Sequence, residues 1–268
     1  MPNAVSFDEV LTEAVNYFVM RGFDDPDSLT YWSKRLEIAA RKELMSTTAL
    51  RRNMKDALAA EYRRQIERGL ILSYHAGLSK QALVTLRADL KLILAKRLSA
   101  ANALVTLNRE EDIAATLRKF TGWASSLPSS SSLNANRSEI RHDIKRALVS
   151  AKHRESNLVL DQRHKLHAGL NAAIAQGGGA IGAIWVSHHT IANYDYREIH
   201  RDLAIESQHT PFLIRNSWAH KQGLLNATGA KFTDQLEHQP GQLPHCKCQF
   251  QYLYTLNDLP SKLVRKAA

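Results

Sequence analysis

Cysteine is scarce in this chain, and other features that mark large classes of protein are missing. Its 268 residues include only two cysteines, and the Cys-x-Cys spacing of that pair does not make a disulfide framework. No stretch approaches the roughly 20 apolar residues of a membrane span. Residues 1–8 have neither a basic start nor a long apolar run, so we expect no secretory signal. We therefore expect a protein that is made and used in a cytoplasm, or packed into a particle there.

Recognisable catalytic motifs are also missing from the first half of the chain. Residues 1–125 contain no glycine-rich phosphate loop, no paired-carboxylate motif and no nucleophile elbow. No part of the sequence resembles a Ser-His-Asp or Cys-His nucleophile arrangement. Hydrophobic residues make up 44% and charged residues 23%, as in an ordinary globular protein. The sequence predicts no active site in its first half.

Positive charge is abundant but dispersed. The formal net charge is +10, which favours contact with nucleic acid, an anionic protein surface or a lipid headgroup layer. The basic residues occur as pairs along helical sequence, and solvated helix faces explain such pairs more often than a DNA groove does. These pairs are Lys34–Arg35, Arg41–Lys42, Arg51–Arg52 and Arg63–Arg64. Charge alone specifies attraction and not a partner.

Helical periodicity dominates residues 1–125. Ser6 followed by Glu9 fits a capping box, and apolar residues then recur on one helix face. Further apolar stripes predict consecutive helices, the fourth beginning near Ser79 and the fifth running from Arg109 to Phe120. We predict a helical domain over residues 1–125.

A serine-rich segment separates this domain from the rest. Ser125–Ser132 is almost entirely serine and proline, which predicts a linker or hinge over residues 126–136. A long helix is expected from Arg137 to Gln176, ended by the glycines at 177–179.

The last 90 or so residues show a different sequence pattern, without the long helical periodicity of the preceding segments. Short apolar or alternating runs at 180–186, 212–215 and 249–254 predict strands. We therefore predict a predominantly α-helical α+β protein. Its helical N-terminal region and long helices lead into a small C-terminal α+β module with short strands, within a second domain of residues 137–268.

The residues that could carry chemistry cluster in this module. Arg197 and His200 share a face if they lie on a helix, and Asp195 precedes them. His200, His245, Cys246 and Cys248 are the side chains that could assemble a tetrahedral metal site. The Cys-x-Cys spacing departs from the two to four intervening residues of most zinc ligand pairs. A structural zinc ion therefore stays an open alternative to no cofactor at all.

Two other interpretations of the same residues remain open. In the first, Cys246 and Cys248 fill space at the start of a strand, and His200 is a packed histidine with a hydrogen bond. The second is a nuclease-like site, in which a histidine activates water beside a metal and an aspartate. Its candidate residues are His188, His189, His200, Asp195 and Asp202. Twelve histidines make accidental clusters common in this chain.

Several short motifs in a fixed order resemble the phage Mu F-like minor head proteins, the phage head morphogenesis family. Residues 185–187 (Trp-Val-Ser) precede residues 194–200, which match the family's Arg-x-x-His core at Arg197 and His200. Residues 212–219, which contain Trp218, resemble a block in one branch of the family. Residues 240–248 stand where the family has Pro-x-Cys-Arg-Cys, and residues 252–260 continue that branch's ending. The likeness covers roughly residues 155–262.

The sequence departs from the family pattern in two places. The family has an Asp-Gly turn soon after the histidine, whereas residues 202–208 contain no glycine. Lys247 replaces the usual arginine between the cysteines, which keeps the charge but loses the planar fork.

The resemblance implies a minor virion component without catalytic activity. Such proteins associate with the portal or the inner capsid during head assembly, so the portal and the major capsid protein are the expected partners. The expected location is the virion and, during assembly, the host cytoplasm. It also implies that one set of residues forms the structural core of the motif: Trp185, Asp195, Arg197, His200, Trp218, His245, Cys246 and Cys248. The alternatives are a basic DNA-binding protein packaged or ejected with the genome and, less favoured, a metal-dependent hydrolase or nuclease.

Overall fold

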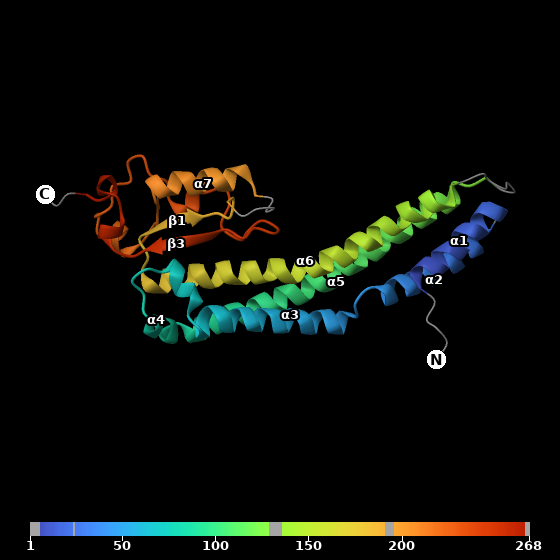
Figure 1. Ribbon diagram of the computed structural model, residues 1–268, viewed down its shortest axis with the longest axis horizontal. Coiled ribbons are helices and arrows are strands. Elements are labelled where there is room, and N and C mark those ends of the chain that lie inside the picture. The colour runs from blue at the N-terminus through green and yellow to red at the C-terminus, as the bar shows by residue number, and fades with distance from the viewer. Residues whose placement is uncertain (1–5, 24, 129–135, 191–195, 266–268) are drawn as a thin grey trace. The chain divides into compact units, whose positions relative to one another are not determined.

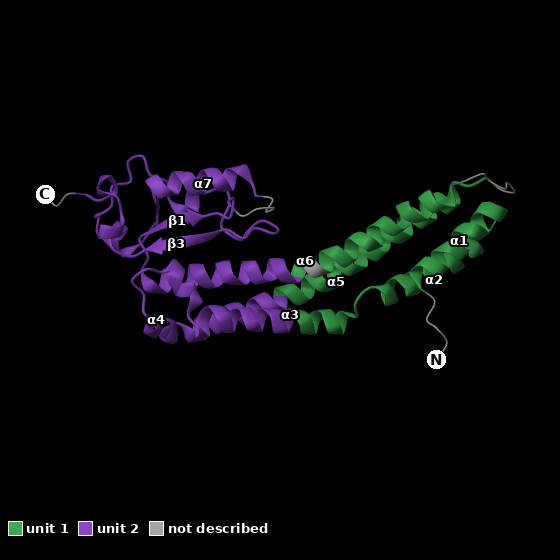
Figure 2. Cartoon of the chain, viewed as in Figure 1, with its two compact units in different colours: residues 1–54, 100–158 green, residues 55–99, 159–268 purple. Residues whose placement is uncertain are grey.

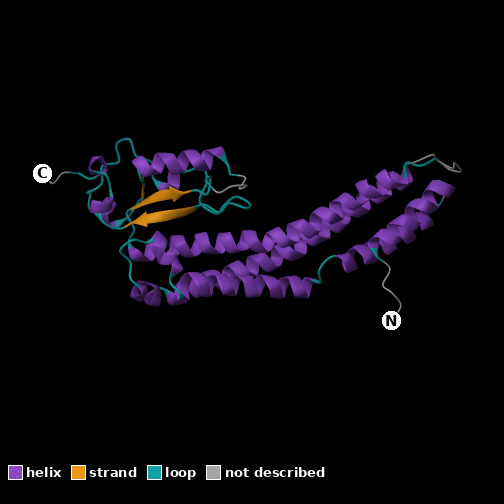
Figure 3. Ribbon diagram, in the orientation of Figure 1, coloured by secondary structure: helices purple, strands orange, loops and turns teal. Residues whose placement is uncertain are grey.

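The chain is predominantly helical and ends in a module with a small sheet, as the sequence predicts (Figures 1 and 3). The computed structural model describes residues 6–23, 25–128, 136–190 and 196–265. The helices are α1 (Phe7–Arg21), α2 (Pro26–Glu43), α3 (Thr47–Tyr62), α4 (Lys80–Thr85), α5 (Arg87–Ser125), α6 (Arg137–Gly178), α7 (Glu198–His209) and α8 (Trp218–Lys221). The strands are β1 (Gly182–Val186), β2 (Phe212–Leu213) and β3 (Gln249–Leu253). Among the described residues, no helix combines the length and apolar content needed to cross a bilayer.

Local sequence signals account for most helix ends. The predicted capping box at the start of α1 is present, because the Glu9 amide donates to Ser6 Oγ at 3.2 Å and the Ser6 amide donates to Glu9 Oε2 at 2.7 Å. Helix α6 begins at Arg137 as predicted and runs to Gly178. Gly179 follows with φ +74°, a left-handed conformation that glycine adopts without steric cost.

One predicted boundary is wrong. The fourth and fifth predicted helices are a single helix, α5, of 39 residues. The break comes earlier, at Leu86, between α4 and α5. No glycine or proline lies between Arg87 and Phe120, so nothing in the covalent chain ends the helix there.

The described residues form two compact units, coloured separately in Figure 2. Unit 1 comprises residues 1–54 and 100–158, and unit 2 comprises residues 55–99 and 159–268. Helices α3, α5 and α6 each contribute residues to both units. The division between the units therefore crosses these helices. The sequence instead predicted a boundary in the serine-rich segment at 126–136. Residues 129–135 of that segment lie outside the described residues.

Unit 1 is a helical assembly with an aromatic core. Phe18 of α1 and Phe120 of α5 are fully buried, with ring centroids 5.8 Å apart in an edge-to-face arrangement. Arg109 of α5 is buried beside Glu155 of α6, with 2.9 Å between Nη2 and Oε1. The Arg109 guanidinium also donates to Thr47 Oγ1 at 2.8 Å. This buried positive charge is therefore paired with a carboxylate and also bonded to a neutral acceptor.

Unit 2 contains an antiparallel three-stranded sheet in the order β2-β1-β3. In its register, Trp185 of β1 lies opposite Phe250 of β3, and Ala183 lies opposite Tyr252. Helix α7 packs along β1, where Ser207 Oγ accepts the Trp185 amide at 2.8 Å (Figure 3). The sheet buries two apolar clusters, one with Trp185 and the other with Leu213.

Two polar contacts attach other parts of unit 2 to β3. Asn171 of α6 is buried, and its side-chain amide donates to the Phe250 carbonyl at 2.7 Å. His75, 1% exposed, lies with Nδ1 at 2.5 Å from the Tyr254 hydroxyl and stacks on Tyr252 with ring centroids 5.5 Å apart. The position of β3 is thus fixed from outside the sheet.

We expect Asn171→Ala to lower the free energy of unfolding of unit 2 by about 1–3 kcal/mol, because it leaves the buried Phe250 carbonyl without its donor. Urea denaturation monitored by tryptophan fluorescence measures the change. Asn157→Ala, at an exposed position of the same helix, is the control and should be neutral within about 0.5 kcal/mol. Equal stabilities of the two variants would contradict this role.

We also expect the stability of unit 2 to fall between pH 7 and pH 5. Burial lowers the pKa of His75 to about 4, and burial likewise lowers the pKa of His167 to about 4. The unfolded chain binds these protons near pH 6.5 and the folded chain does not, so at pH 5 each histidine costs about 2 kcal/mol. The slope of stability against pH should be shallower in His75→Phe than in the wild type. Equal slopes would show that His75 does not titrate this way.

Candidate functional site

Residues from three separate segments meet beside β1. Trp185 comes from the strand itself, His200 from the first turn of α7, and Cys246 and Cys248 from the segment that leads directly into β3. The His200 and Trp185 ring centroids are 5.0 Å apart. The four side chains are each no more than 2% exposed, so this cluster belongs to the interior of unit 2.

Arg197 explains how the separate segments come together. It is the N-cap residue of α7, and its Nη2 donates to the Pro244 carbonyl at 3.0 Å. His200 lies one helical turn after Arg197, and Cys246 lies two residues after Pro244. An arginine that binds the Pro244 carbonyl therefore aligns the histidine of α7 with the cysteine segment.

The histidine faces both sulfurs. His200 Nδ1 is 3.7 Å from Cys246 Sγ and 3.5 Å from Cys248 Sγ. A metal ion can be shared by histidine, cysteine or acidic side chains whose ligand atoms lie close together. Within the described part of the chain, these three residues form such a group. Their ligand atoms all lie within 4.8 Å of one another.

The two thiols have opposite electrostatic properties. The hydrogen bond from Cys248 lowers the pKa of Cys246 to about 6, against the effect of burial. The pKa of Cys248 is raised, because its thiol proton is held by Cys246 and the group is buried. At neutral pH the pair therefore carries about one negative charge. Burial, with the positive Arg197 nearby, lowers the pKa of His200.

The structure brings together only some of the residues expected in the motif. His245 is exposed and is not in the His200 group, so the expectation that it is a metal ligand and a core residue is wrong. His245 lies in a turn and not in an extended segment. The His245 backbone is also fixed in the left-handed region at φ 61°, with its amide donating to Asp161 Oδ1 at 2.8 Å. Asp195 lies outside the described residues.

The nuclease-like arrangement is not assembled among the described residues. Asp202 is 62% exposed and pairs with Arg201, with 3.0 Å between Nη2 and Oδ1. His189 Nδ1 lies 2.8 Å from Ser187 Oγ. Neither residue is in the group that surrounds His200.

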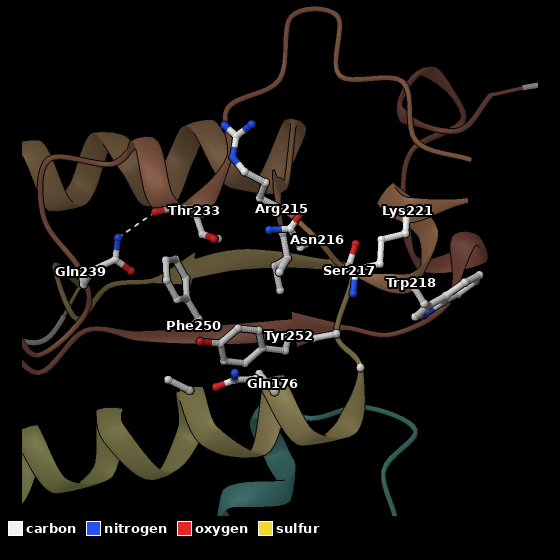
Figure 4. A pocket seen from close by; sticks show the side chains of 15 residues that line it. Gln176, Arg215, Asn216, Ser217, Trp218, Lys221, Thr233, Gln239, Phe250 and Tyr252 are labelled. Carbon is white, nitrogen blue, oxygen red and sulfur yellow. Dashed lines mark hydrogen bonds between the residues drawn. The ribbon is translucent and has the colours of Figure 1, made fainter. Parts of the chain in front are cut away.

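Trp218 was also expected in the core, and this expectation is wrong. Its side chain is 40% exposed and lines a pocket of about 660 Å³. Arg215, Asn216, Ser217 and Lys221 from the same segment line the pocket with it, and β3 contributes Phe250 and Tyr252 (Figure 4). Gln239 donates to the Thr233 carbonyl at 2.7 Å at the pocket's other end (Figure 4). The polar and basic neighbours of Trp218 were the sequence signal for an exposed position.

Comparison of the chain with protein-family models, curated proteins and solved structures found no match.

We expect both thiols to resist alkylation in the native protein at pH 7.5, although Cys246 is a thiolate at that pH. An electrophile cannot reach sulfurs whose residues are 1–2% exposed until the module opens. Mass spectrometry after timed iodoacetamide treatment should show at least hundredfold slower labelling than in urea. Ser126→Cys, at an exposed position, supplies a fast-reacting reference in the same molecule. Labelling of Cys246 at the reference rate would contradict the buried geometry.

Proposed function

We propose that this chain is a structural, non-catalytic minor head protein of a bacteriophage, which binds the portal or the inner capsid protein during head assembly. One observation carries the proposal. The motifs that resemble the head morphogenesis family extend from Trp185 to Cys248, 63 residues apart in sequence, yet Trp185, His200 and the Cys246–Cys248 pair pack together in one core. This packing gives each motif a structural reason, since together they hold a small sheet in place.

Burial of the cluster supports a structural role over a catalytic one. A hydrolase needs its metal or general base open to substrate and water, whereas His200, Cys246 and Cys248 are 1–2% exposed. If the hydrolase alternative holds instead, His200→Ala abolishes a measurable hydrolytic activity while the fold survives. If the role is structural, the same change lowers both thermal stability and incorporation into particles.

The surface of the same module offers a docking position for the protein partner. Trp218 is exposed beside Lys221, and an aromatic anchor next to a cation fits an acidic patch on a protein surface. We propose that the portal protein presents this patch. The motif residues in the interior then set the position of the anchor without touching the partner.

The second candidate function is DNA binding, favoured by the net charge of +10. Arg51 and Arg52 are exposed on α3, whereas Arg41 pairs with Glu37 and Glu110 at 2.9 and 2.7 Å, which reduces the charge available to phosphates. Non-specific DNA binding would weaken steeply with salt. Nuclease treatment would then release the chain from purified particles, but would leave a portal-bound chain in place.

We expect Trp218→Ala to reduce co-purification with portal rings at least tenfold while the module stays folded, because the indole is 40% exposed and lies outside the two buried apolar clusters of the sheet. Co-expression, nuclease treatment and affinity capture of the portal measure this. Tyr31→Ala removes an aromatic side chain that is 56% exposed on α2, and as the control it should leave capture unchanged. Full capture of Trp218→Ala would exclude the proposed docking position, and no capture of the wild type would exclude the portal as partner.

A further inference from the structure

We propose that His200, Cys246 and Cys248 bind one zinc ion, with His238 as the fourth ligand, and that this ion is a structural element of the module. The alternative is a hydrogen-bonded cluster without metal. Three observations favour the zinc site over the metal-free cluster. They are the geometry of the three buried side chains, the backbone around Cys246 and the location of His238.

The distances match the edges of a zinc coordination tetrahedron. With Zn–S of about 2.3 Å and Zn–N of about 2.0–2.1 Å, a nitrogen and a sulfur ligand of one ion lie about 3.6 Å apart. His200 Nδ1 lies 3.7 Å from one sulfur and 3.5 Å from the other. All three ligand atoms lie within 4.8 Å of one another.

A hydrogen-bonded cluster accounts less well for this arrangement. A single ring nitrogen is either one donor or one acceptor in neutral imidazole. It therefore forms one good hydrogen bond and cannot serve two sulfurs at nearly equal distances. A cation placed between the three atoms contacts all of them, and two thiolates neutralise its double charge, which removes most of the cost of burying it.

The backbone around Cys246 is arranged for a thiolate. The amides of Gly241 and Cys248 both donate to its sulfur, as amides commonly do around metal-bound ligands. Gly241 has φ +73°, and a Cβ there would lie 2.8 Å from Ala168 Cβ of α6. Only glycine permits this close approach to α6, and the packing keeps the Gly241 amide next to the Cys246 sulfur.

His238 lies beside His200, although it is not among the residues whose ligand atoms gather within 4.8 Å of one another. Its ring centroid is 6.1 Å from that of His200, in a T-shaped arrangement. Two imidazoles on one tetrahedral ion have centroids about 5 Å apart, so His238 must shift toward His200 for one of its ring nitrogens to reach the ion. Its side chain is 24% exposed, in the same loop as Gly241, and this partial exposure leaves room for that shift. Four protein ligands make a closed, structural site.

Zinc is the ion that this ligand set selects. Two sulfurs and two imidazoles in a buried tetrahedron suit Zn²⁺, whereas Mg²⁺ and Ca²⁺ require oxygen ligands. The short Cys-x-Cys spacing is accommodated because His200 and His238 approach from two other segments. The chain therefore does not have to wrap around the ion with the cysteines alone.

Metal content of the full-length protein tests the proposal directly. Protein expressed with added zinc and passed through size exclusion should retain about one zinc per chain by plasma mass spectrometry. Cys246→Ser, Cys248→Ser and His200→Ala should each retain less than about a tenth of that, and His245→Ala should retain all of it. A wild-type protein without zinc overturns the proposal, and so does loss of zinc in His245→Ala.

Cobalt substitution tests the ligands without relying on the variants to fold. Co²⁺ added to the wild-type apoprotein should give intense visible bands of tetrahedral geometry and a thiolate-to-cobalt charge-transfer band. A weak octahedral spectrum without the charge-transfer band overturns the sulfur ligands.

Competition with a chromophoric chelator tests the fourth ligand. His238→Ala should weaken zinc binding at least tenfold while keeping the charge-transfer band. Unchanged affinity in this variant overturns the role of His238.

Discussion

The burial of one imidazole against a tryptophan and two sulfurs is the interaction on which the rest of unit 2 depends. The sheet has three strands, one of them only two residues long, so its stability depends on the side chains and the helix that pack against it. His200 ties the start of α7 to β1 through Trp185, and it ties the start of β3 to both through the cysteines. Arg197 adds the backbone contact at Pro244 that sets this alignment.

The sequence predicted those parts of the fold that local signals determine. The capping box at Ser6, the glycine after α6 and the alternating residues of β3 each act within a few positions, so their consequences could be predicted from the chain alone. The candidate site was harder, because it depends on which side chains meet across 46 or 48 residues. Ligand chemistry indicated His200 and the cysteines. His245, next to Cys246 in sequence, was expected to be a ligand with them, but it lies in a turn with φ 61° and is exposed.

Composition proved a poor guide to the division into units. The serine-rich segment is the clearest break in composition, but compact units form where side chains pack, and α3, α5 and α6 each pack in both. A helix of 39 residues continues as long as its backbone hydrogen bonds are unbroken, whatever it contacts along its length. Breaks in composition mark where a chain can turn, whereas unit boundaries depend on tertiary contacts that no local window contains.

If the module binds a protein partner as proposed, recognition and architecture use different residues. The motif residues Trp185, His200, Cys246 and Cys248 are buried, so they determine shape and cannot touch a partner. Arg215, Trp218 and Lys221 line the surface pocket and are exposed. Two chains with the same buried motif can therefore differ at these positions and bind different partners. The motif alone predicts the scaffold, and the exposed segment between β2 and the end of α8 is where the choice of partner must be sought.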